Sequence, residues 1–174
     1  MKWCRFSSGN GISYGIIEGD NVVEVDGNPF DGYTKTSKSQ PLASVKLEVP
    51  VIPPTFYAAG INYPEHVTWA AKMRGEEPVL PEKADIGYRA INALVPNEHP
   101  IIVPSDATEL LQYEGELVVV IGKECKNVTQ DQALDYVLGY TIGNDVSERT
   151  WQRGDRTMWR AKNTDTFKPM GPWI

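Results

Sequence analysis

The first fifty residues carry short runs in which apolar and polar positions mix, the pattern of β-strands at a domain surface. Residues 12–17 and 21–25 form two such runs, and a Glu-Gly-Asp turn sequence lies between them. This arrangement predicts a β-hairpin. Residues 26–40 are polar and show no period, so we predict a loop there, followed by another short segment over residues 42–47.

A proline-containing connector follows this β unit. Pro53 and Pro54 come directly after Val51 and Ile52. Proline fixes φ and lacks an amide donor, so the stretch disfavours both a strand interior and a helix. We therefore predict a small N-terminal β domain over residues 1–50 and a second domain over residues 51–174.

The second domain begins with a predicted strand and helix. Residues 55–60 are largely apolar, which predicts a buried strand. Residues 64–73 predict a helix, with Pro64 in its first turn and Gly75 just past its end. Residues 74–99 are charged and show little period. A long loop in a compact domain is often a lid over a binding site, although a solvated insertion fits the same pattern.

Three further strands are expected in the rest of the chain. They cover residues 101–104, 110–121 and 136–142. The second of these is the strongest, and its apolar run over residues 117–121 predicts burial on both faces.

Composition and charge argue against a nucleic-acid-binding or membrane-spanning protein. The net charge is −6, which leaves no basic patch of the kind that binds nucleic acid. Apolar runs fall well short of the ~18 residues needed to cross a membrane. The two cysteines, Cys4 and Cys125, form no CxxC pair, so we expect reduced thiols in a cytoplasmic protein. The acidic balance suits a protein that collects cations.

Three carboxylates follow the predicted strands. Glu114 and Glu116 alternate with Gly115, so they point to the same face, roughly 6–7 Å apart along the strand. Asp145 follows a second apolar run at a bend. A divalent cation would relieve the repulsion between such carboxylates, since Mg²⁺, Mn²⁺ and Ca²⁺ prefer oxygen ligands. A solvent-facing strand edge and an Asx turn are the structural alternatives.

Four basic side chains are further candidates. His66 lies near the start of the predicted helix and could act as a general base, or be an ordinary surface histidine. Lys162 could neutralise an anionic substrate or a developing enolate, or be solvated. Arg89 and Arg160 could hold a substrate carboxylate through paired hydrogen bonds.

Taken together, these motifs resemble the fumarylacetoacetate hydrolase family. They occur in the order of that family and at similar spacing, from about residue 55 onward. The matching segments are Gly60-Ile61-Asn62-Tyr63-Pro64-Glu65-His66, Tyr113-Glu114-Gly115-Glu116-Leu117-Val118-Val119-Val120-Ile121-Gly122, Gly143-Asn144-Asp145-Val146-Ser147, and Lys162-Asn163-Thr164-Asp165-Thr166-Phe167 with Pro169-Met170-Gly171-Pro172.

The resemblance implies an α+β, mostly β fold, with strands rolled into a distorted barrel behind the small N-terminal β unit. It implies a Mg²⁺ or Mn²⁺ site formed by Glu114, Glu116 and Asp145. It also implies a homodimer that acts on small 2-oxo or enol acids by acylpyruvate hydrolysis, oxaloacetate decarboxylation or enol isomerisation. Gln152 and Lys162 match positions beside the substrate in relatives, and Tyr63 belongs to the same set of candidates.

Two departures from the family pattern bear on the reaction. Many relatives carry a glutamate three residues after the histidine, where this chain has Trp69. This change favours isomerisation or decarboxylation over hydrolysis. Relatives also continue for roughly another hundred residues, so we expect this chain to be a fragment of the catalytic domain. The alternatives are an inactive fragment or paralogue that keeps the fold and metal site, and a β binding module with surface carboxylates.

Overall fold

The computed structural model describes residues 1–9 and 11–174, which form two compact units. The larger unit comprises Met1–Ile52 and Asn92–Ile174, and the smaller comprises Pro53–Ile91. The N-terminal β unit thus shares its spatial unit with the C-terminal part of the chain. The predicted division of the sequence at residue 50 stays a prediction.

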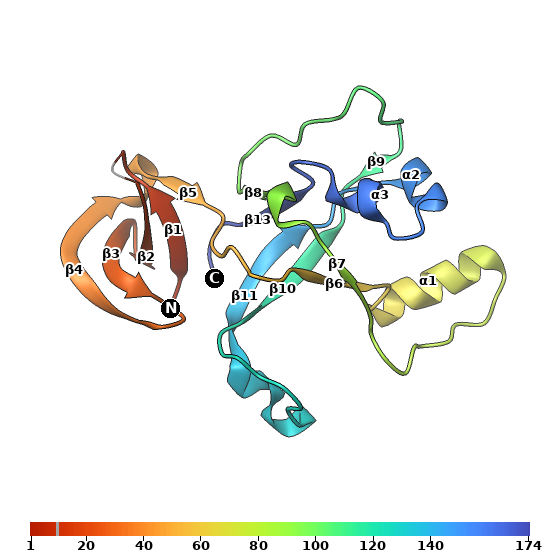
Figure 1. The fold of residues 1–174 in the computed structure, drawn as a ribbon, viewed down its shortest axis with the longest axis horizontal. Coiled ribbons are helices and arrows are strands. Elements are labelled where there is room, and N and C mark those ends of the chain that lie inside the picture. Colours follow the sequence, from red (N-terminus) through yellow and green to blue (C-terminus); the bar gives the residue numbers. More distant parts are fainter. Residues whose placement is uncertain (10) are drawn as a thin grey trace. The chain divides into compact units, whose positions relative to one another are not determined.

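The N-terminal part of the larger unit is a five-stranded sheet with the order β4-β3-β2-β1-β5 (Figure 1). The predicted hairpin is confirmed, because β2 and β3 pair antiparallel. Cys4, Phe6 and Val22 form the buried core of this sheet, and Trp173 packs against them from the C-terminal end of the chain. The strands are β1 (Trp3–Ser7), β2 (Ile12–Glu18), β3 (Asn21–Asn28), β4 (Gly32–Pro41) and β5 (Lys46–Glu48), and the 3₁₀ helix η1 (Leu42–Ser44) precedes β5.

The loop predicted over residues 26–40 is wrong. Strand β3 continues to Asn28, and β4 is a ten-residue edge strand paired with it. The Asn28 side chain closes the turn by accepting hydrogen bonds from the Phe30 and Asp31 amides at 2.8 and 3.0 Å. Because an edge strand that faces water on both sides needs no apolar alternation, its sequence resembles a loop.

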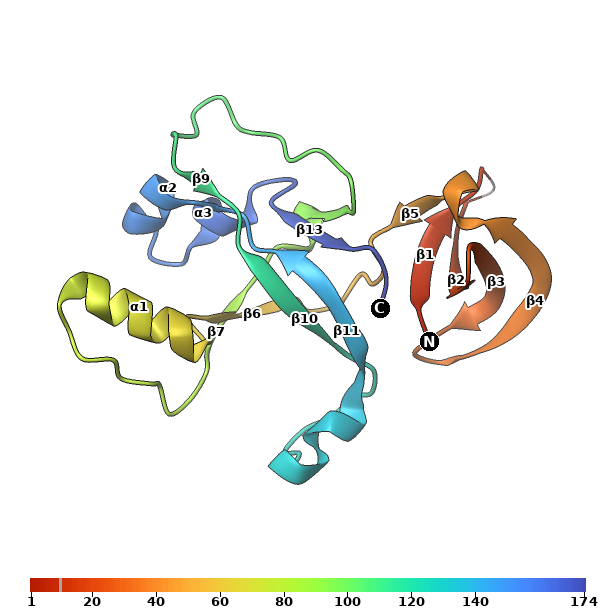
Figure 2. The same cartoon turned by 180° about the vertical axis from the view of Figure 1, so that it is seen from behind.

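The second sheet of the larger unit has the order β10-β11-β13-β8. Strands β10 and β11 form a long antiparallel ribbon, which both views show (Figures 1 and 2). The strand predicted over residues 136–142 is confirmed by β11. The strands are β8 (Leu94–Pro96), β10 (Gly115–Ile121), β11 (Val137–Asn144) and β13 (Lys168–Gly171).

Three expectations for this region need correction. The strand predicted over residues 110–121 is broken at Tyr113 and Glu114 into β9 (Leu111–Gln112) and β10. Residues 101–104 are not a strand, and β8 lies upstream of them. The run over residues 117–121 is not buried on both faces, because β10 is an edge strand. Leu117, Val119 and Ile121 are 62%, 47% and 52% exposed.

Short elements join these strands. Strands β9 and β12 pair antiparallel, which brings Gln112 opposite Ser147. The short connecting elements are η2 (Ile91–Ala93), β9 (Leu111–Gln112), η3 (Gln130–Tyr136), β12 (Ser147–Glu148), α2 (Arg149–Gly154) and α3 (Trp159–Asn163).

The smaller unit holds helix α1 (Pro64–Arg74) and the paired strands β6 (Tyr57–Gly60) and β7 (Asp85–Tyr88). The predicted helix is confirmed: Pro64 occupies its first turn, and Gly75 ends it in a left-handed conformation with φ of 70°. The strand expected to be buried is exposed over most of β6. Residues 74–99 are not one long loop, because they contain β7, η2 and β8.

The mostly β fold class is confirmed. In residues 1–9 and 11–174 the strands form four separate sheets, and no sheet closes into a barrel. The same residues contain no helix that is both long and apolar enough to span a membrane.

The two thiols should react differently, because their surroundings differ. Cys4 is buried, and this burial raises the pKa of its thiol to about 11. Cys125 is exposed. A thiol-disulfide reagent at pH 8 should therefore modify one thiol per native chain and a second only after denaturation, and Cys125→Ser should abolish the fast reaction. Fast modification of Cys4 in the native Cys125→Ser chain would contradict this assignment.

Candidate functional site

Two of the predicted carboxylates face each other across the β10–β11 ribbon. Glu114 directly precedes β10 and Asp145 directly follows β11, and the ribbon pairs Gly115 with Asn144. The Asp145 amide donates to the Glu114 carbonyl at 2.9 Å, and the Glu114 amide donates to the Asn144 side-chain oxygen at 2.9 Å. Antiparallel pairing therefore brings two carboxylates together that are 31 positions apart in the sequence.

Glu116 occupies the same ribbon, two residues further along β10. It is half-buried and lies opposite Gly143. A Cβ atom at position 143 would lie 2.8 Å from a methyl group of Val118, so glycine lets the two strands pack closely here. Glu116 shares the less exposed face of β10 with Val118 and Val120.

Lys162 joins Glu114 to Asp145. Its Nζ lies 3.0 and 3.1 Å from the two carboxylate oxygens of Glu114 and 2.7 Å from Asp145 Oδ2. The Lys162 side chain is only 6% exposed. Helix α3 holds it there, and the Asp155 carboxylate supports that helix by accepting a hydrogen bond from the Arg160 amide at 2.7 Å.

Lys168 is a second buried lysine that contacts Asp145, and the sequence patterns did not single it out. Its Nζ lies 2.8 Å from Asp145 Oδ1, and its side chain is 2% exposed. The same ammonium donates to the Phe167 and Val146 carbonyls at 2.9 and 3.1 Å. Each oxygen of Asp145 therefore contacts a different lysine.

Arg149 and Ser147 complete the surroundings of Glu114. Arg149 Nη1 lies 2.6 Å from Glu114 Oε1, and the Ser147 hydroxyl lies 2.8 Å from the same oxygen. Burial alone would raise the pKa of Glu114, but Lys162, Ser147 and Arg149 outweigh it and hold that pKa below its usual value. Glu114 is therefore ionised at neutral pH.

The Glu114 and Asp145 carboxylates are the type of ligand that a hard divalent cation prefers. Glu114 and Asp145 supply oxygen ligands, and they already converge on one positive charge, the Lys162 ammonium. Within the residues that the structure describes, no three His, Cys, Asp or Glu side chains surround a common point. A third carboxylate ligand would therefore require a shift of Glu116 toward the other two.

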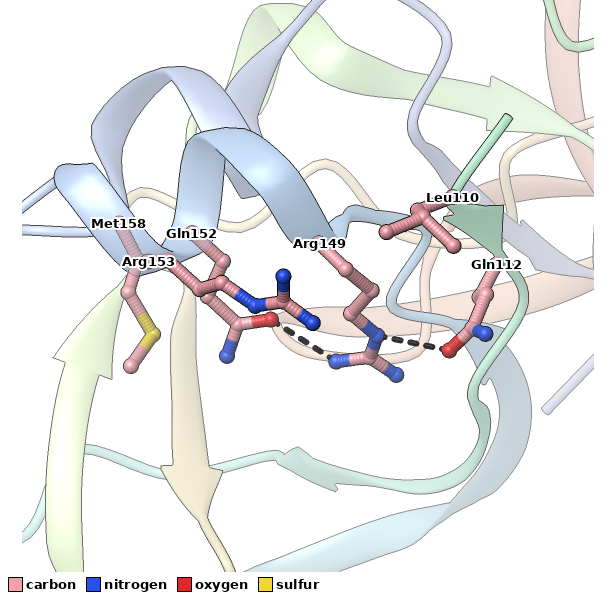
Figure 3. Close-up of a pocket in the computed structure, with 6 residues that line it drawn as sticks. All are labelled: Leu110, Gln112, Arg149, Gln152, Arg153 and Met158. Carbon is pink, nitrogen blue, oxygen red and sulfur yellow. Dashed lines mark hydrogen bonds between the residues drawn. The ribbon is translucent and has the colours of Figure 1, made fainter. Parts of the chain in front are cut away.

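A pocket of about 440 Å³ adjoins this cluster through Arg149, which contacts Glu114. Figure 3 shows the residues that line it. Arg149 lies at its centre, with its guanidinium donating to Gln112 and Gln152 at 2.9 Å each. Arg149 is thus shared between the pocket and the carboxylate Glu114. The pocket is lined by Leu110, Gln112, Arg149, Gln152, Arg153 and Met158.

The structure places the other candidates outside this cluster or in the smaller unit. Arg160 pairs with Asp106 and lies over the Trp151 ring, 4.0 Å from its centroid. Tyr63, His66 and Arg89 belong to the smaller unit. His66 is exposed on α1, and its ring centroid lies 6.0 Å from that of Trp69, as expected for side chains one turn apart.

Glu148 is a buried carboxylate that supports the helix carrying Arg149, and the sequence patterns did not single it out either. It is fully buried, accepts a hydrogen bond from the Trp151 amide at 2.6 Å, and bonds the amide and hydroxyl of Thr108. It thereby caps α2, the helix that begins with Arg149, and ties it to the chain before β9. Burial opposes ionisation of Glu148, but these hydrogen bonds outweigh it and lower its pKa.

Glu148→Gln should lower the free energy of unfolding by about 2–3 kcal/mol at pH 7, since hydrogen bonds to a buried charge are lost. Because the folded-state pKa of Glu148 is lowered, its contribution is present above the unfolded-state pKa and lost as the pH falls through the folded-state value. Urea unfolding at several pH values should show the two proteins converging in acid. A constant difference down to low pH would contradict the assignment.

Family profiles match nearly the whole chain. Residues 55–174 match the profile described as "Fumarylacetoacetate (FAA) hydrolase C-terminal". Residues 1–50 match "Rv2993c-like, N-terminal".

Solved structures share the fold and about a third of the sequence. A 5-carboxymethyl-2-hydroxymuconate delta-isomerase from Mycobacterium smegmatis is 39% identical with a TM-score of 0.87, over 100% of this chain and 66% of that one. A 2-hydroxyhepta-2,4-diene-1,7-dioate isomerase from Mycobacterium marinum is 36% identical with a TM-score of 0.85, over 100% and 65%.

A more distant structure contains a metal. It is a maleylpyruvate hydrolase from Sphingobium sp. SYK-6 in complex with manganese(II) and pyruvate, 25% identical with a TM-score of 0.70, over 100% of this chain and 66% of that one. The chain therefore spans just under two thirds of the length of each of these three proteins.

Proposed function

Because the chain belongs to the fumarylacetoacetate hydrolase family, we propose that it is part of a divalent-metal-dependent enzyme that acts on a small 2-oxo or enol carboxylate. Its similar structures support this substrate class: two are isomerases of hydroxylated dienoate acids, and one is a maleylpyruvate hydrolase. The family membership confirms the resemblance that the sequence motifs predicted. The proposal leaves isomerisation, hydrolysis and decarboxylation as candidate reactions.

The observation that carries the proposal is the convergence of Glu114 and Asp145 on one positive charge. Glu114, Glu116 and Asp145 would hold a divalent cation, and manganese in the maleylpyruvate hydrolase structure supports a metal of the Mg²⁺ or Mn²⁺ class. When bound, such a cation supplies Lewis-acid stabilisation of enolate charge.

The pocket beside the cluster would bind the acid. Arg149 and Arg153 give it positive charge, and the Gln152 and Gln112 amides add hydrogen-bonding groups. The Arg149 guanidinium is already held by Gln112, Gln152 and Glu114, so it is oriented before a substrate carboxylate arrives, which lowers the entropy cost of binding. We propose that Arg149 and Gln152 orient the substrate carboxylate.

Two further groups would take part in the reaction. We propose that Lys162 provides positive charge close to the developing enolate, because its ammonium is buried between the two carboxylates. We propose His66 as the general base, and the family's usual homodimer as the assembled form.

Turnover assays with Mn²⁺ and Mg²⁺ test the proposal. The full-length protein should act on at least one of an acylpyruvate, oxaloacetate or a hydroxylated dienoate. Removal of metal with EDTA should abolish turnover, and added Mn²⁺ should restore it. Turnover that survives complete metal removal would contradict the metal-dependent mechanism, and inertness toward every acid would contradict the substrate class.

A further inference from the structure

The two lysines that contact Asp145 are held in different ways. Lys162 Nζ is held by the carboxylates of Glu114 and Asp145. Lys168 Nζ contacts Asp145 Oδ1 and also donates to two backbone carbonyls, those of Val146 and Phe167.

The carbonyl contacts fix Lys168 independently of the carboxylate. An ammonium has three donors, and these three contacts satisfy all of them. Lys168 belongs to β13, a strand paired on both sides, and its side chain is 2% exposed. Lys168 is therefore held by backbone carbonyls as well as by Asp145, whereas the described contacts of the Lys162 ammonium are with the two carboxylates alone.

The described ion pairs of Glu114 and Asp145 already compensate the negative charge of both carboxylates. Glu114 and Asp145 contribute two negative charges, and Lys162, Lys168 and Arg149 contribute three positive charges. A shift of Glu116 toward this cluster, from its position two residues along the strand, would bring the count to three against three. A divalent cation added to this cluster would create an excess of positive charge in a poorly solvated site, which is unfavourable unless an anion enters with it.

We propose that Lys168 is a fixed counter-charge on Asp145 that makes binding of the divalent cation depend on simultaneous binding of an anionic ligand. This inference rests on the proposed function, since it assumes that a cation binds at Asp145. The coupling is reciprocal, so the cation must raise the affinity for the anion by the same factor. The fixed charge of Lys168 would keep the site from binding a metal ion tightly before an acid substrate is present.

Equilibrium titration with Mn²⁺, with and without oxalate, tests this role. Oxalate is a dianion whose adjacent oxygens imitate those of a 2-oxo acid, and the titrations are corrected for Mn²⁺–oxalate complexes in the buffer. In the wild-type protein, oxalate should lower the apparent Kd for Mn²⁺ by about tenfold or more, within the usual range of coupling between sites. In Lys168→Met this ratio should fall below about threefold.

Three variants separate charge from structure. Lys126→Met removes an exposed lysine and should keep the wild-type ratio. Lys168→Arg keeps the positive charge and should retain most of the coupling. If Lys168→Met does not fold, Lys168→Gln, which is neutral but retains N–H donors, carries the same expectation as Lys168→Met.

The possible results separate the role of Lys168 from the metal-dependent function itself. If Lys168 only stabilises the fold, Lys168→Met should lower the melting temperature but leave the effect of oxalate on the Mn²⁺ Kd unchanged in the folded protein. That result would overturn the inference while leaving the proposed function intact. Absence of Mn²⁺ binding by the wild-type protein, with and without oxalate, would overturn the metal-dependent function and this inference with it.

Discussion

Lys162→Met should lower the free energy of unfolding by about 3 kcal/mol at pH 7, because it removes the cation shared by two poorly exposed carboxylates. The Asp145 and Glu114 side chains are 11% and 20% exposed, so water compensates them only in part. The remaining contacts with Lys168 and Arg149 place the effect at the lower end of the range for broken buried pairs. Urea unfolding followed by tryptophan fluorescence measures it.

The pH dependence of this loss has a defined sign. The pKa of Glu114 is lowered in the folded protein, so the stabilisation it shares with Lys162 is present above the unfolded-state pKa. That stabilisation disappears as the pH falls through the folded-state value, and the two proteins should converge in acid. Lys126→Met, at an exposed lysine, should change stability by less than about 0.5 kcal/mol. An equally small effect at Lys162 would show that the buried cluster does not stabilise the fold.

His66→Ala should lower acylpyruvate hydrolysis by about 100-fold or more at saturating Mg²⁺, the usual scale for loss of a general base. Decarboxylation should fall only modestly, because loss of carbon dioxide forms an enolate without removal of a proton by a base, and a bound cation would stabilise the enolate charge. His66 is exposed on α1, so its removal should leave the stability of the fold nearly unchanged.

The second histidine offers a matched control for His66. His99 is exposed, and its Nδ1 lies 2.8 Å from the Pro100 carbonyl. His99→Ala should keep full activity in both assays. Unchanged hydrolysis in His66→Ala would remove His66 from the mechanism and leave the cation site as the remaining catalytic element.

Local patterns predicted the elements whose stability is local. The β2–β3 hairpin has its own turn sequence, and α1 has a proline at its start and a glycine after its end. Strand β4 could not be predicted in this way, because its polar residues are held in a strand by pairing with β3 rather than by burial. The same limit applies to β10, whose apolar side chains looked buried although one face is exposed.

The site was predictable to the extent that strand geometry determines it. The end of β11 placed Asp145 beside Glu114, as the sequence suggested, whereas the convergence of Glu116 on the same point stays a prediction. Lys168 and Arg149 carry no local pattern that points to Asp145 and Glu114. Their contacts depend on how β13 and α2 pack against the ribbon, which no spacing in the sequence records.

The most direct test of the proposed metal site is the affinity for Mn²⁺ in Glu116→Ala compared with the wild-type protein. Glu124→Ala, which removes an exposed carboxylate, serves as the matched control. If Glu116 joins Glu114 and Asp145 around the cation, Glu116→Ala should weaken binding by at least about tenfold, the scale at which even outer-shell changes act. Glu124→Ala should bind like the wild type. Equal affinity in Glu116→Ala and the wild-type protein would contradict the three-carboxylate site.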